Sequence, residues 1–138
     1  MSTIRAVLLV SGLISLASAS AKDAEPAAKA PEAKRTILDR HDQDGVPGKE
    51  IVLGTAEFPK GAAIGWHTHS GDEAGYVLRG NLILKTRGQA DRPLKAGDYF
   101  FNAQGAIHSL QAAPDGDGGA VVSTWVVDKG KPLADPVP

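Results

Sequence analysis

A series of short apolar runs separated by turn-forming residues constrains the fold of this chain more than any other feature. Each run is rich in Val, Ile, Leu and aromatic residues, and segments containing glycine, proline or asparagine separate the runs. The runs are Glu50–Phe58, Ala63–His69, Ala74–Arg79, Leu82–Thr86, Asp98–Asn102, Ala106–Gln111 and Gly119–Val127. Beyond the N-terminal segment the sequence shows no sustained helical period. The pattern therefore predicts an all-β sandwich or barrel rather than a parallel α/β sheet.

Three of the four histidines lie within two of these runs, close to a carboxylate. Residues two apart in a strand point to the same face, so His67 and His69 are expected to project side by side. Glu73 follows four residues after His69, and His108 lies in a run that could pair beside the first. Three neutral imidazoles and one carboxylate form a complete ligand set for a divalent metal ion, with positions left open for a substrate. The spacing thus predicts a metal site made of His67, His69, Glu73 and His108.

Glycines near this cluster predict how the chain turns and where a ligand has room. Gly80-Asn81 is predicted to form a two-residue hairpin between Ala74–Arg79 and Leu82–Thr86, because both residues tolerate positive φ. Gly75 and Val77 are small residues predicted to point inward, so they would leave space beside the metal.

Other polar and aromatic residues around the cluster have simpler interpretations. His41 lies in a polar, turn-like stretch and is interpreted as a solvated loop histidine. Asp72 could act as a base beside the metal, but a turn aspartate next to Gly71 explains it equally well. By strand alternation Trp66 and Tyr76 face away from the neighbouring ligands, which favours packing against another sheet or subunit.

The ligand cluster resembles the first motif of the cupin superfamily. That motif is a glycine, five residues, His-x-His, three or four residues, a glutamate, six residues and a glycine. In this chain these positions are occupied by Gly61, His67, His69, Glu73 and Gly80. The first motif is highly specific, and every one of its positions is matched.

A second cupin motif is matched in part. It runs glycine, five residues, proline, one residue, glycine, two residues, histidine, three residues, asparagine. Gly97, Gly105 and His108 fit it, whereas Ala103 stands where proline is usual and Ala112 where asparagine is usual. The resemblance spans roughly residues 36–128 and implies a small jelly-roll barrel with a metal inside one mouth. A barrel this small often pairs through its outer sheet, so we expect a homodimer; a light-scattering mass equal to one chain would exclude it.

Function is less constrained than the site. A divalent ion held by three histidines and Glu73 stays net positive and can bind and polarise a bidentate oxygen ligand such as an enediol, a diol or a hydroxy acid. With Fe, Mn, Ni, Co or Cu the small jelly roll would be dioxygenase-like, and Glu73 could release and act as a base. With Zn, isomerisation or hydrolysis is favoured. The alternative is a non-catalytic, metal-dependent module that binds or senses a small ligand. Both interpretations need the same ligands, so the sequence leaves both open.

The N-terminus predicts export. A single positive charge, an apolar and small-residue core and the Ala17-Ser18-Ala19 triplet are typical of a signal peptide over residues 1–21, cleaved after Ala19 or Ala21. The apolar stretch is shorter than the about 20 residues that a membrane-spanning helix needs. Because cysteine is absent, disulfides and a lipid-anchored cysteine are excluded. We therefore expect a periplasmic or secreted protein without a stable membrane anchor.

The remaining segments are predicted to be a flexible linker over residues 22–35, a cupin domain over residues 36–128 and an extended tail over residues 129–138. The linker is Ala, Pro, Lys and Glu, which cannot bury enough surface to offset its ordering entropy. The tail contains three prolines and could lie on the surface or clasp a partner subunit. Net charge is −1, or −2 once Arg5 is removed with the signal. No basic stripe with interleaved aromatics is present, so nucleic acid is not expected as a partner.

Overall fold

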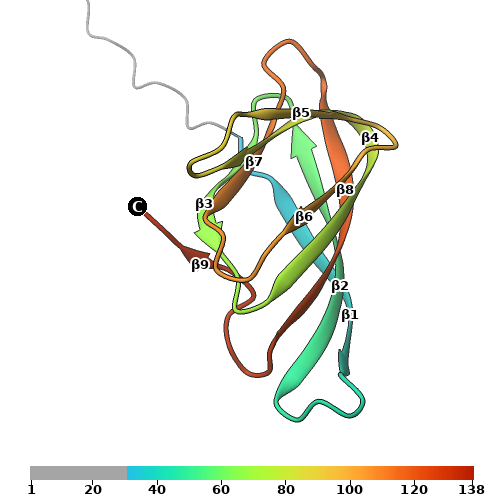
Figure 1. Ribbon diagram of the computed structural model, residues 1–138. Helices are drawn as coiled ribbons and strands as arrows, with labels where there is room; N and C mark the ends of the chain where they lie inside the picture. Colours follow the sequence, from blue (N-terminus) through green and yellow to red (C-terminus); the bar gives the residue numbers. More distant parts are fainter. Residues whose placement is uncertain (1–30) are drawn as a thin grey trace, which may run out of the picture.

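The structure, a computed structural model, describes residues 31–138 and is all β within that range (Figure 1). The predicted signal peptide and most of the predicted linker lie outside the described residues. No helix long and apolar enough to cross a membrane occurs in residues 31–138. The strands are β1 (Lys34–Asp42), β2 (Lys49–Pro59), β3 (Ala63–Thr68), β4 (Asp72–Thr86), β5 (Arg92–Lys95), β6 (Tyr99–Asn102), β7 (His108–Ala112), β8 (Gly118–Asp128) and β9 (Asp135–Pro136).

These strands form one curled antiparallel sheet in the order β1-β2-β8-β4-β7-β3-β9, with β5 and β6 also paired to β4. The long strand β4 belongs to both halves: its first part pairs with β8 and β6, and its second part pairs with β7 and β5. The two halves therefore face each other across a common interior, and the predicted all-β jelly roll is confirmed.

The predicted hairpin at Gly80-Asn81 is wrong. β4 runs without interruption through both residues, and only Gly80 adopts a positive φ, of 80°. A type I′ hairpin needs a positive φ at both central residues. Instead, Gly80 bends β4 from one half of the sheet into the other. A Cβ at Gly80 would lie 2.0 Å from the carbonyl oxygen of Gly118, so the close approach of β4 to β8 requires glycine here.

β1 was not predicted as a strand, and it includes Lys34 and Arg35, which the sequence assigned to the linker. It pairs along β2 at the edge of the sheet and is almost entirely exposed, so it lacks the apolar alternation by which strands are recognised. His41 lies in this strand rather than in a loop, and its exposed ring is 3.2 Å from the Asp39 carboxylate. The edge strand β5 was not predicted either, because it is short and mostly exposed and shows no apolar alternation.

The interior contains a large apolar cluster and a smaller one. The large cluster includes Phe58, Val77, Leu82 and Phe100. Val77 is fully buried in it, and a Cβ at Gly75 would lie 2.1 Å from the Phe100 ring. The space that Gly75 and Val77 were expected to leave for a ligand is therefore filled by Phe100 and the core. The smaller cluster consists of Val52, Trp125 and Val127, with Leu133 of the tail packed against it.

The outer surface of the sheet carries exposed aromatic residues. Trp66 and Tyr76 are 37% and 47% exposed, so both face away from the ligand side of their strands as predicted. On β6, next to Tyr76, the rings of Tyr99 and Phe101 lie 6.3 Å apart and are also exposed. The pairing of two copies through this surface stays a prediction.

Candidate metal centre

The three predicted histidines converge inside the curled sheet. β3 and β7 are neighbours, and His67 is the direct partner of His108 in their ladder. His69 follows β3, and its ring centroid lies 4.9 Å from that of His67 and 5.1 Å from that of His108. All three rings are buried, and one nitrogen from each lies within 4.8 Å of the others. The strand register thus brings together side chains that are up to 41 positions apart in the sequence.

The turn before His108 forms although proline is missing from it. The backbone N–H of Ala106 donates to the carbonyl of Ala103 at 2.9 Å, and that of Gly105 donates to the carbonyl of His69 at 3.1 Å. The second bond ties this turn directly to another histidine of the centre. Ala112, where asparagine is usual, is buried in the large apolar cluster. Neither departure from the second motif disturbs the position of His108.

Each histidine is oriented by a backbone carbonyl. Nδ1 lies 2.8 Å from the carbonyl oxygen of Gly65 for His67, 2.9 Å from that of Ala106 for His108, and 2.5 Å from that of Leu133 for His69. A carbonyl oxygen can only accept, so each Nδ1 must carry the proton. In the neutral rings Nε2 therefore carries a lone pair and no proton. This is the usual state of histidine ligands in metal sites, where the second nitrogen is fixed by a hydrogen bond.

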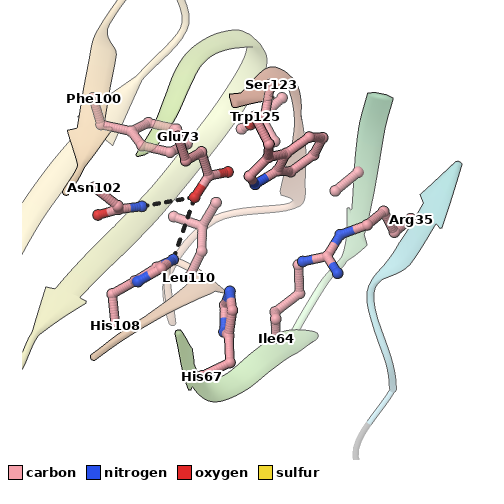
Figure 2. Close-up of a pocket in the computed structure, with 12 residues that line it drawn as sticks. Arg35, Ile64, His67, Glu73, Phe100, Asn102, His108, Leu110, Ser123 and Trp125 are labelled. Carbon is pink, nitrogen blue, oxygen red and sulfur yellow. Dashed lines mark hydrogen bonds and ion pairs between the residues drawn. The ribbon is translucent and has the colours of Figure 1, made fainter. Parts of the chain in front are cut away.

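Glu73 completes the group from β4. Its Oε2 atom accepts a hydrogen bond from Asn102 Nδ2 at 2.8 Å and lies 3.3 Å from Nε2 of His108 (Figure 2). The same atom lies 3.3 Å from Nε2 of His69. Burial alone would raise the pKa of the carboxyl group, but contacts with His108 and His69 and the bond from Asn102 outweigh burial and hold the pKa below its usual range. Glu73 is thus a buried carboxylate.

This arrangement fits a bound cation. Burial, together with the nearby His108, His69 and Arg35, lowers the pKa of His67 to about 4 despite its bond to Gly65, so its ring is neutral near pH 7. With their Nδ1 protons facing carbonyls, neutral rings of His69 and His108 would each present a lone pair to the Glu73 carboxylate at 3.3 Å, which is repulsive. Nε2 of His108 is buried without a hydrogen-bond partner. A divalent ion between the three Nε2 atoms and Glu73 would remove both problems.

A small cavity lies beside these ligand atoms. His67, His108 and Glu73 form one side of it, and Arg35, Ile64, Phe100, Ser123 and Trp125 are among the residues of the other walls (Figure 2). It leaves about 20 Å³ for the centres of water-sized molecules. A single water needs about 10–15 Å³ by this measure. The cavity therefore has room for one or two water-sized molecules, so a bound ligand must be small.

The C-terminal tail, residues 129–138, is part of the centre, which the sequence did not predict. It returns along β3, where β9 pairs at His67 and Thr68 and the N–H of Val137 donates to the carbonyl of Trp66 at 2.9 Å (Figure 1). The carbonyl of Leu133 orients His69. In the sequence, the apolar residues Leu133 and Val137 of this polar, proline-rich tail indicate that it packs on the domain, but they do not indicate the carbonyl contact with His69.

Two further neighbours of the ligands were also missed. Asn102 holds Glu73, and the indole N–H of Trp125 points at Nε2 of His69 from 3.3 Å. Both lie at inward positions of predicted strands, so alternation could have identified them. Asp72, by contrast, is exposed, and its carboxylate accepts a bond from the backbone N–H of Gln104 at 2.8 Å. Asp72 is the first residue of β4 rather than a turn residue, and it does not line the cavity beside the ligands.

Comparisons with known proteins agree with this architecture. Residues 54–127 match the Cupin domain family. A 70-residue segment is 31% identical to an oxalate-binding protein of Thermotoga maritima, and the match covers 50% of this chain and 57% of that protein. The chain thus spans a little over half the length of this relative.

Solved structures show the same fold. A cupin-like protein of Thermotoga maritima has a TM-score of 0.55 at 27% identity, with 76% of this chain and 75% of that chain covered. A DMSP lyase of Ruegeria pomeroyi has a TM-score of 0.57 at 20% identity, with 63% and 43% covered. The second likeness concerns the fold alone.

Proposed function

The chain belongs to the cupin family, and from this premise we propose that it holds one divalent transition-metal ion through His67, His69, His108 and Glu73 and uses it to capture a small oxygenated organic molecule. The observation that carries the proposal is the convergence of three buried histidines, two of which, His69 and His108, place Nε2 3.3 Å from the Glu73 carboxylate. Nitrogen and carboxylate ligands of this kind suit Fe, Mn, Ni, Co, Cu or Zn.

Capture of a small bidentate oxygen ligand is the role that the geometry supports best. Four protein ligands would leave room for further ligands on a divalent ion, which would keep a net positive charge beside a single carboxylate. The cavity accepts only a small molecule. Oxalate is a small bidentate oxygen ligand, so the relative named as an oxalate-binding protein supports the proposal.

Dioxygenase-like turnover of the same small molecule is the second candidate. A redox-active ion in this centre would supply oxygen activation. Among residues 31–138, Glu73 is the carboxylate that borders the cavity, so it is placed to take a proton at the reacting atoms. Asn102 fixes one of its oxygens, so a proton would be received at the other. Consumption of O2 only in the presence of a bound organic ligand would favour this candidate over simple capture.

Elemental analysis of the untagged protein tests the metal site. We expect about one equivalent of a transition metal in the wild-type protein and none in a His67→Ala/His69→Ala double variant. His41→Ala is the matched control, because His41 is exposed on β1 and outside the centre. Equal metal contents in the wild-type protein and the double variant would contradict the proposal. Zinc alone would weigh against dioxygenase chemistry.

We also infer that the mature protein is periplasmic or secreted, from the signal-like residues 1–21. The full chain would be expressed in a bacterium, and the intact mass of the protein in the periplasmic fraction would be measured. We expect the mass of a chain that begins at Ser20 or Lys22. A full-length mass in the cytoplasm would contradict export.

A further inference from the structure

Arg35 places a positive charge at the edge of the metal cavity. It projects from β1 toward the space between His67 and Trp125, and its guanidinium carbon lies 5.6 Å from the centre of the Trp125 ring (Figure 2). Its Nε atom is buried without a hydrogen-bond partner among residues 31–138. Burial lowers the pKa of the guanidinium, and attraction to Glu73 offsets this only in part. The charge of Arg35 is thus poorly solvated and has unused hydrogen-bonding capacity.

A second polar group in the same cavity also lacks a partner. Ser123 is 2% exposed, and its Oγ atom has no hydrogen-bond partner among the described residues. Buried polar atoms are nearly always paired with protein, water or ligand. Arg35, Ser123 and Nε2 of His108 all line one cavity, so a single set of ligand atoms in that cavity could satisfy all three.

The net charge of the groups around the cavity indicates the charge of the ligand that would bind there. With neutral histidines, a divalent ion, the Glu73 carboxylate and the Arg35 guanidinium leave two positive charges in excess. Buried charges are costly unless they are paired. A neutral diol would leave this excess in place, whereas a carboxylate would reduce it. A guanidinium is also the side chain best shaped to bind a carboxylate through two parallel hydrogen bonds.

We propose that Arg35 and Ser123 form a carboxylate subsite beside the metal, so that the captured molecule is a small carboxylate with a second oxygen on the adjacent carbon. One carboxylate oxygen and the second oxygen would bind the metal held by the histidines and Glu73, and the other carboxylate oxygen would face Arg35. Two-carbon hydroxy acids and dicarboxylates are among the smallest molecules that meet both requirements, which suits a cavity this small. This inference rests on the proposed metal site.

Calorimetric titration of the cobalt-loaded protein tests the subsite. The probes are oxalate, glycolate and the neutral diol ethylene glycol. We expect oxalate and glycolate to bind the wild-type protein more tightly than ethylene glycol does. In Arg35→Met we expect carboxylate affinity to fall about 10- to 100-fold, which is the usual effect of losing hydrogen bonds to a charged group. Binding of Co²⁺ itself and of ethylene glycol should stay close to wild type.

Two variants accompany this test. Arg79→Met is the matched control, since Arg79 is exposed on β4 and pairs with Glu57 outside the cavity; it should leave carboxylate affinity unchanged. Arg35→Lys keeps the charge without the planar fork, and an intermediate affinity is expected. If Arg35→Met does not fold, Arg35→Lys becomes the variant that tests the subsite.

The outcomes separate the two proposals. If the wild-type protein binds Co²⁺ but Arg35→Met binds oxalate as tightly as wild type does, the subsite is wrong and the metal site stands. Binding of Co²⁺ without any binding of carboxylate by the wild-type protein has the same meaning. If the wild-type protein does not bind Co²⁺, the proposed function fails and the subsite fails with it.

Discussion

The two ends of the described chain, β1 and the C-terminal tail, both reach the metal centre, but they contribute to it in opposite ways. β1 sends a charged side chain, Arg35, to the edge of the cavity and is held along its length by its ladder with β2. The tail contributes a backbone atom, the Leu133 carbonyl, and is held by a short pairing with β3 and a few other contacts. One end acts through the identity of a residue, the other through the position of its backbone.

This difference has consequences for stability and for ligand binding. The tail packs Leu133 against the smaller apolar cluster and satisfies the Nδ1 proton of His69, so it should stabilise the protein whether or not metal is bound. Arg35 brings a poorly solvated charge that gains a partner only when an anion enters. The effect of Arg35 on stability should therefore change with the ligand, and that of the tail should not.

Removing the tail after Lys131 should have the largest effect. The truncation deletes the Leu133 carbonyl, and loss of a group that orients a metal ligand typically lowers metal affinity by about 10- to 100-fold. The free energy of unfolding should fall as well, because Leu133 and β9 are lost. Competition titration with Zn²⁺ and urea denaturation would measure the two effects. Unchanged metal affinity would show that the tail does not orient His69.

Leu133→Ala separates the backbone contribution of the tail from its side-chain packing. The variant keeps the carbonyl that faces His69 but loses the contact with Val52, Trp125 and Val127. Because Leu133 is only partly buried, we expect a loss of about 1–2 kcal/mol in the free energy of unfolding. Metal affinity should stay within a fewfold of wild type. If Zn²⁺ affinity fell as far as in the truncated protein, packing rather than the carbonyl would be what positions His69.

The parts of the site that could be predicted from the sequence are those fixed by strand geometry. Alternation places His67 and His69 on one face, and the pairing of their run with that of His108 follows from an antiparallel barrel. The hairpin at Gly80-Asn81 failed because a glycine with positive φ suits a bend within a strand as well as a turn. Only the close contact with β8 decides between them, and that contact is made with a distant part of the chain.

The contributions of the two chain ends could not be predicted, for two separate reasons. Arg35 lies on an edge strand that is mostly polar, and nothing in its sequence neighbours indicates that its guanidinium is turned toward a cavity. Leu133 acts through its carbonyl, a group that every residue has, so no residue type could mark it. Side-chain chemistry leaves a trace in the sequence, whereas a backbone contact made across the fold does not.

Arg35→Met should have a smaller effect on stability than either tail variant, and its sign should depend on the ligand. Without metal, removing a partly buried charge that lacks a full partner should leave the free energy of unfolding unchanged or raise it by up to about 1 kcal/mol, since the lost contact with Trp125 offsets part of the gain. With Co²⁺ and oxalate bound, the wild-type protein should be the more stable of the two. Thermal melts in both conditions would show this reversal, and a variant less stable than wild type in both would contradict it.

Asp128, at the root of the tail, should have the smallest effect of all. Hydrogen bonds from Lys131 and then Lys49 lower the pKa of its carboxyl group to about 2, from an ordinary value of 3.8. A carboxylate with a lowered pKa stabilises the fold above its unfolded pKa, and that stabilisation is lost as the pH falls through the folded value. In the metal-free protein, the difference in Tm between wild type and Asp128→Asn should thus be largest near neutral pH and shrink between about pH 4 and pH 2. Asp115→Asn, in the exposed loop before β8, should show no such change. A constant difference at every pH would mean that these ion pairs do not hold the tail, and that its contacts with β3 and Trp125 suffice.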